Sequence, residues 1–182
     1  MEVIGILIII VAAIALWGVR IYNELVGIRE NVFNAKSQIA VQIESRWDAL
    51  KSIIDATKQY SRHEAETLEK VTAQRTSVSQ ASSVEAMEKS EEQFAGVLSR
   101  LIAVAEAYPE LKASELYQNA MRSVEEFENK VRQSRMIYND SVTKLNRAVQ
   151  EFPSSVIAGM FNFTKEPYFE ETEEKREMPS WE

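Results

Sequence analysis

The chain of 182 residues carries a formal net charge of -7 and contains no cysteine, five glycines and four prolines. This acidity argues against a nucleic-acid partner, because phosphates bind to clusters of basic residues. The lack of cysteine excludes disulfides, thiolate catalysis and cysteine-based metal sites. So few turn-forming residues leave little scope for the short connections of an all-β fold, and the composition therefore predicts long helices.

The first element is an apolar run, VIGILIIIVAAIALWGV, that extends from Val3 to Val19 without a charge. Counted to residue 21 it has about 19 residues, or roughly 28 Å of helix, close to the roughly 30 Å hydrocarbon core of a bilayer. The preceding residues lack the basic region of a signal peptide, and the run ends in bulky side chains rather than a small-residue cleavage site. We therefore expect residues 1–21 to form a retained transmembrane anchor whose interface residues are Trp17, Arg20 and Tyr22.

The charges around this anchor predict its orientation. Arg20, Arg29 and Lys36 follow the apolar run, whereas no lysine or arginine precedes it. Because loops that carry basic residues stay in the cytoplasm, we expect a single-pass protein with a short N-terminus outside and the C-terminal domain in the cytoplasm.

From Tyr22 the apolar positions recur at helical spacing, without a proline as far as Ser61. One row, interrupted by Arg46, contains Leu25, Val32, Ile39, Ile53 and Tyr60. The adjacent row contains Val26, Phe33, Ala40, Trp47 and Ile54. This stripe is broader than the seam of a two-stranded coiled coil, so it predicts the core face of a helical bundle.

Local signals divide the rest of the bundle. Ser61 and Glu64 have the spacing of a capping box, so residues 64–80 either form a separate helix or prolong the first. The sequence TSVSQASS, residues 76–83, has the composition of a linker. A second strong helix is expected over residues 84–107, because Pro109 stops it, and a third over 114–151.

These elements predict an all-α fold, in which an N-terminal transmembrane helix continues into an antiparallel bundle of three long helices and one shorter helix, residues 22–152. Residues 153–163 are apolar and could pack on the end of the bundle, touch the bilayer or meet a neighbouring subunit; packing is the favoured interpretation. Residues 164–182 are acidic and are expected to form a disordered tail. The aromatic pairs Tyr168-Phe169 and Pro179-Trp181 leave room for a short docking motif.

The sequence contains no recognisable catalytic or cofactor motif. His63 is the only histidine, and in HEAET Thr67 replaces the second histidine of a zinc-protease pattern. Phosphate-binding GxxxxGK[ST] and GxGxxG loops are missing. We therefore predict that the protein is not an enzyme and has no cofactor or metal; a carboxylate and metal site around Glu64 is the weaker alternative.

Several segments resemble a known family. They include YNELVGIRENVFNAKSQIAVQIESRWDAL, QYSRHEAETLEKVTAQR, LIAVAEAYPELKAS and ENKVRQSRMIYNDSVTKLNRAVQEFP. In this order, after an N-terminal anchor, they resemble the LemA family of bacterial membrane proteins. The resemblance implies a single-pass protein of the bacterial cytoplasmic (inner) membrane with a helical-bundle domain and no established enzymatic activity. It also implies a role in the cell envelope, beside partners such as membrane proteases.

A set of polar residues in the last long helix is the best candidate for a specific site. Arg135, Tyr138, Asn139 and Asn146 lie near one helical face and could reach Asn31 or its neighbours on the first helix. A buried polar network that sets the helix register is the favoured interpretation, and a ligand or partner groove is the alternative.

Two functional hypotheses follow from these features. The favoured one is a non-enzymatic, membrane-anchored scaffold that forms homo-oligomers and organises protein partners at the cell envelope. The other is a sensory helical module that binds a small ligand between its helices and transmits the change along the anchor helix.

Overall fold

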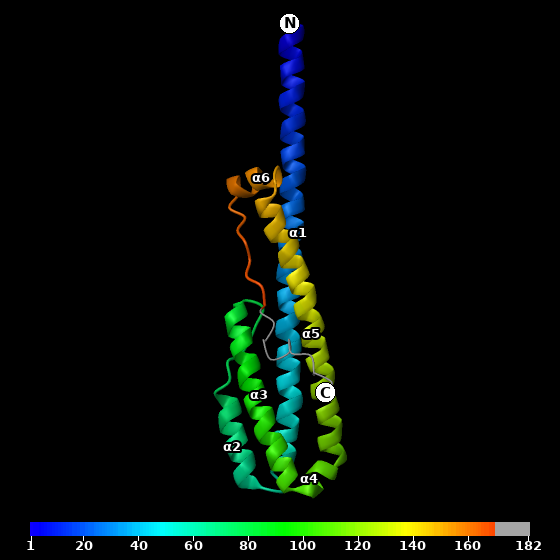
Figure 1. Ribbon diagram of the computed structural model, residues 1–182, viewed down its shortest axis with the longest axis vertical. Helices are drawn as coiled ribbons and strands as arrows, with labels where there is room; N and C mark the ends of the chain where they lie inside the picture. The colour runs from blue at the N-terminus through cyan, green and yellow to red at the C-terminus, as the bar shows by residue number, and fades with distance from the viewer. Residues whose placement is uncertain (170–182) are drawn as a thin grey trace, which may run out of the picture.

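The structure of the chain is a computed structural model that describes residues 1–169. Within these residues the chain forms helices and no strand (Figure 1), so the all-α prediction is confirmed. The helices are α1 (Glu2–Thr57), α2 (Arg62–Ala73), α3 (Val84–Ala107), α4 (Pro109–Ala113), α5 (Glu115–Gln150) and α6 (Ser154–Met160).

The long helices run alternately along one axis (Figure 1). Helices α2 and α5 run antiparallel to α1, α3 runs parallel to it, and α4 turns the chain at the end far from the N-terminus. Helix α5 has 36 residues, or about 54 Å of helix, and α1 continues for a similar length beyond residue 21. The end of α5 therefore returns to the level at which the apolar run of α1 ends.

Helix α1 changes from exposed to buried at that level. The apolar run is uncovered, with exposed fractions such as 52% for Ile10 and 57% for Val19, whereas Leu25 is 1% exposed and Ile39 and Leu50 are 0% exposed. Helix α1 is long and apolar enough to cross a membrane, and its most apolar 18 residues are not buried in the protein. One uninterrupted helix thus joins a membrane-length segment to the centre of the bundle.

Serine caps and a proline set the helix boundaries. The hydroxyls of Ser61, Ser83 and Ser114 accept hydrogen bonds from the backbone N–H groups at the starts of α2, α3 and α5, respectively, at 3.2–3.4 Å. Each satisfies a donor that the helix itself cannot pair. Pro109 opens α4, where its missing N–H is harmless. The stretch after Ser61 is therefore a separate, antiparallel helix rather than a prolongation of α1, which ends at Thr57.

The C-terminal segment differs from the sequence prediction in part. Residues 164–169, expected to begin a disordered tail, lie in extended conformation along α5, and Phe169 is only 3% exposed. Side chains of α5 form hydrogen bonds with the backbone of this segment. These bonds hold it in place although it can bury little apolar surface. Residues 170–182, including the Pro179-Trp181 pair, lie outside the described part of the chain.

Candidate functional site

Two asparagines of α5 hold the extended segment 164–169, here called the strap. The Asn146 amide donates to the backbone carbonyl of Glu166 at 2.9 Å, and its oxygen accepts from the Glu166 N–H at 2.9 Å. Asn139 repeats this pairing with Phe169, at 3.1 Å to the carbonyl and 3.0 Å from the N–H. Each amide thus replaces the partner that a β-strand would offer, and seven-residue spacing places both on one helical face.

Tyr138 makes two further contacts with the strap. The Tyr138 hydroxyl donates to the carbonyl of Pro167 at 2.9 Å, and its ring meets that of Phe169 edge-on at 5.2 Å. Burial, followed by the nearby charges of Glu166 and Glu85, raises the pKa of Tyr138 to about 12. The hydroxyl is therefore a neutral donor at physiological pH, as the bond to Pro167 requires.

The predicted polar set is brought together with one exception. Arg135 lies over the Phe169 ring at 5.3 Å, so it joins Tyr138, Asn139 and Asn146 around the strap. Asn31 is exposed on α1 and does not join them. The buried stripe of α1 passes through Val32 beside it, which leaves the asparagine outside this stripe. The polar residues of α5 consequently bind the chain's own C-terminal segment rather than polar groups of the anchor helix.

A buried ion cluster lies next to the strap. Arg46 of α1 is only 1% exposed, and its guanidinium donates to Glu91 of α3 and Glu128 of α5. It also lies 4.0 Å from the centre of the Phe94 ring. Arg135 binds the other oxygen of Glu91 at 2.8 Å. The cluster therefore ties the three long helices together, and Arg135 connects it to the strap.

The charges in this cluster oppose one another. Burial raises the pKa of the Glu91 carboxyl above its ordinary value, while Arg46 and Arg135 act in the opposite direction. Removal of either arginine would leave a carboxylate poorly compensated in a dry environment. In the sequence, Arg46 is visible only as an interruption of an apolar row. An arginine at such a position, together with acidic residues on other helices, is the signal that could have identified the cluster.

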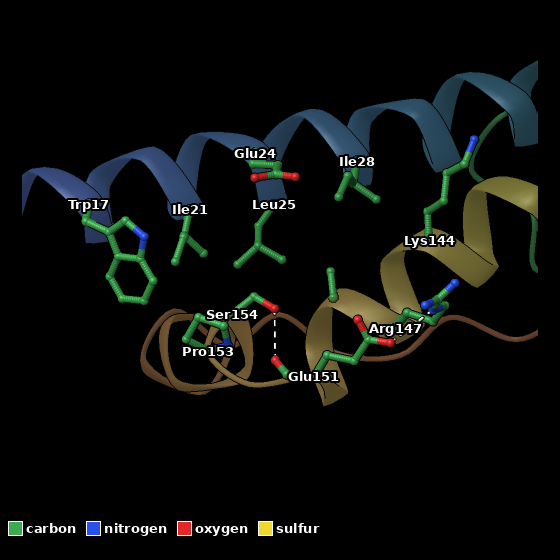
Figure 2. Close-up of a pocket in the computed structure, with 11 residues that line it drawn as sticks. Trp17, Ile21, Glu24, Leu25, Ile28, Lys144, Arg147, Glu151, Pro153 and Ser154 are labelled. Atoms are coloured by element: carbon green, nitrogen blue, oxygen red, sulfur yellow. Dashed lines mark hydrogen bonds and ion pairs between the residues drawn. The ribbon is translucent and has the colours of Figure 1, made fainter.

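A cavity of about 620 Å³ lies where α1 leaves the bundle, between α1, α5 and α6. Figure 2 shows Trp17, Ile21 and Leu25 directed from α1 towards Pro153 and Ser154. The polar part of its lining comes from Glu24, Lys144, Arg147 and Glu151. The cavity therefore has an apolar floor next to the membrane-length segment and a mixed-charge rim.

The predicted interface residues surround the same junction. Trp17 lines the cavity, Arg20 is exposed, and the Tyr22 ring lies 4.6 Å from that of Phe161. Their contact with a membrane surface stays a prediction. His63 is exposed at the start of α2. Among residues 1–169, no three histidine, aspartate or glutamate side chains gather into a group that could hold a metal ion.

Comparison with known proteins adds a family and three relatives. The sequence model of the LemA family matches residues 35–182, which is most of the chain. LemA is not a known enzyme family. The chain is also 31% identical over 78 residues to magnetosome proteins MamQ 1 and MamQ 2 of Paramagnetospirillum magneticum, and 30% identical to magnetosome protein MamQ of Magnetospirillum gryphiswaldense. These matches cover 43% of this chain and 29% of each relative, so less than a third of each relative is represented.

Proposed function

Since the chain belongs to the LemA family, we propose that it is a non-enzymatic, single-pass scaffold of the bacterial cell envelope that self-associates and organises protein partners. One observation carries this proposal: α1 passes without a break from an exposed apolar run into the core of the bundle. A bundle built on its own anchor has its position and tilt coupled to the membrane. Such coupling suits a scaffold, because a scaffold holds its partners in place and needs no catalytic side chain.

The proposed location is the cytoplasmic membrane, with the N-terminus outside and the bundle in the cytoplasm. The basic residues Arg20 and Arg29 follow the apolar run directly, and the positive-inside rule then places the bundle in the cytoplasm. The matches to magnetosome proteins cover too little of those relatives to supply a partner for this chain. Membrane proteases of the envelope remain the partners that the family resemblance implies.

Self-association draws support from apolar side chains left uncovered on the two longest helices. Phe33 and Val41 on α1 are 44% and 57% exposed, and Met136 and Ile137 on α5 are 68% and 48% exposed. In this proposal these side chains contact a second copy of the chain, as exposed apolar groups do where they gather into one patch.

Cysteine crosslinking in native membranes tests the scaffold proposal, because the chain has no cysteine of its own. We expect Met136→Cys to give a disulfide-linked dimer under mild oxidation. The control is Glu125→Cys, an exposed polar position on the same helix, which should stay monomeric. Monomers at both positions, together with purification that recovers no other membrane protein, would contradict the proposal.

A ligand-sensing module is the second candidate, and the cavity at the junction is the observation that favours it. A small molecule between Ile21, Leu25 and Ala148 would contact the anchor helix and α5 at once. In a metabolite screen, a bound ligand would raise the melting temperature of the wild type and not that of Ala148→Phe, which fills the cavity. A screen without any such response would remove this candidate.

A further inference from the structure

The segment around α6 exposes an apolar surface where the bundle meets the anchor. Thirteen residues in sequence, 152–164, carry no charge. Phe152, Val156 and Met160 are 83%, 54% and 70% exposed, and Phe161 is 52% exposed. Val156 and Met160 are four residues apart in α6, which places them on one side of that helix, and Phe152 lies just before its start. The opposite side is covered, since Ala158 is 1% exposed.

The covered side of α6 rests on the end of the membrane-length segment. A Cβ atom added at Gly18 would lie 3.6 Å from the Cδ1 atom of Ile157, so Ile157 lies directly against the apolar run. Tyr22 contacts Phe161, with ring centres 4.6 Å apart. Helix α6 also lies across the axis of α1 rather than along it (Figure 1). If α1 is perpendicular to the bilayer, α6 is parallel to the bilayer surface.

The chain leaves α6 in a direction that returns it to the bundle. Asn162 has a φ of 55°, a left-handed conformation that asparagine tolerates well, and the Phe163 N–H donates to the Ala158 carbonyl at 2.9 Å. This is the long hydrogen bond of a Schellman motif, which ends a helix and reverses the chain. Arg29 of α1 lies over the Phe163 ring at 4.9 Å, and Asn146 of α5 binds the backbone of Glu166. The chain after the turn therefore lies on the bundle side of α6.

We propose that α6 and its flanking phenylalanines are a second membrane-contacting element, embedded in the interfacial layer of the lipid bilayer beside the anchor. The occupant is lipid because the exposed apolar side chains Val156 and Met160 belong to a helix that packs, through Ile157, on the uncovered apolar run at Gly18. The phenylalanines Phe152 and Phe161 flank this uncharged helix, and aromatic side chains are common at the level of the lipid headgroups.

Such a contact gives the bundle two attachments to the bilayer, one through α1 and one through α6. A single helix allows the bundle to tilt in any direction, whereas a second contact to one side restricts this tilt and keeps the same side of the bundle next to the surface. The strap follows α6 in sequence, so the same contact sets the height of the strap above the membrane. The inference rests on the proposed membrane anchoring of α1, and its test has to separate the two.

Site-directed spin labelling of the full-length chain in phosphatidylethanolamine and phosphatidylglycerol vesicles tests the inference. The label would be placed singly by Val156→Cys or Met160→Cys, both on exposed side chains, with Glu125→Cys as the exposed control position on α5. We expect the α6 labels to gain access to oxygen and to lose access to a water-soluble nickel chelate. The Glu125 label should show the reverse.

Ile10→Cys, in the middle of the apolar run, reports on the anchor separately. Deep burial at Ile10 together with nickel-accessible labels at Val156 and Met160 would overturn the second contact and leave the anchor intact. Nickel access at Ile10 itself would overturn the proposed anchoring. Labels on α6 that are shielded from both reagents, with spin–spin broadening that disappears on dilution with unlabelled chain, would show that a second copy covers this face and would also overturn the inference.

Discussion

Replacement of Arg46 by methionine should destabilise the bundle strongly. The residue is 1% exposed and donates to both Glu91 and Glu128. Removal of one partner from a buried ion pair costs about 3–5 kcal/mol. Glu91 keeps Arg135 at 2.8 Å, and the Glu128 side chain is 39% exposed. We therefore expect the lower end of this range, about 3 kcal/mol.

Thermal unfolding followed by far-ultraviolet circular dichroism in detergent measures this loss. For a chain of this size, each kcal/mol lowers the melting temperature by about 2–4 °C, so R46M should melt about 6–12 °C below the wild type. The double variant R46M/E91Q should recover more than half of the difference, since it removes the carboxylate left without its main partner. The exposed Lys58 pairs with Asp55 at 2.9 Å, and K58M should melt with the wild type.

The pH dependence of the R46M deficit distinguishes a charge effect from a packing effect. Without Arg46 the pKa of Glu91, already raised by burial, rises further. The folded variant then binds a proton more readily than the unfolded chain, so its stability increases as the pH falls from 7 towards 5. A deficit that is the same at both pH values, or that E91Q does not relieve, would refute the ion-cluster account.

Three further predictions concern the strap and the helix caps. Asn139→Ala and Asn146→Ala should each weaken the binding of the strap to α5 by about 1–2 kcal/mol, because each variant loses two hydrogen bonds. Faster amide exchange at residues 166 and 169 would report it, and the exposed Asn31→Ala should change nothing. Tyr138, with a pKa of about 12 against an ordinary 10, should ionise last in a tyrosinate titration. The stability that the neutral Tyr138 hydroxyl contributes is complete below pH 10 and is lost as the pH rises to about 12, because the pKa is higher in the folded state. A Tyr138→Phe variant should lose less stability than the wild type over this range, and an equal loss would contradict this. Ser114→Ala should cost about 1 kcal/mol in urea unfolding, and Ser114→Gly only a few tenths; equal losses would exclude a capping role.

The helices could be predicted from the sequence because their signals are local. A serine cap acts on the N–H groups of the next turn, so Ser61, Ser83 and Ser114 mark three helix starts without knowledge of the fold. Pro109 likewise acts on its own neighbours. The periodicity also identified the buried face of α1, since Ala40, Trp47 and Ile54 of the second apolar row are buried. Phe33, on the same row, is the exception at 44% exposed.

The strap and the ion cluster could not be predicted because their partners are distant in sequence. Asn146 and Glu166 are 20 positions apart, and Arg46 and Glu128 are 82 positions apart. An acidic segment with few apolar residues indicates disorder when it is read alone. Here the two asparagines supply backbone hydrogen bonds that composition does not record. Their seven-residue spacing places both on one helical face, but only the fold shows what that face binds.

Helix α1 is one rigid helix from its membrane-length segment into the core of the bundle. Spin labels at Val19 and Val41, both 57% exposed on α1, are 22 residues apart, which corresponds to about 33 Å at the rise of an α-helix. Pulsed electron paramagnetic resonance on the full-length chain in lipid should give a single narrow distance distribution near that value. A broad distribution, or a maximum several ångströms shorter, would reveal a hinge between anchor and bundle and would contradict a rigid α1.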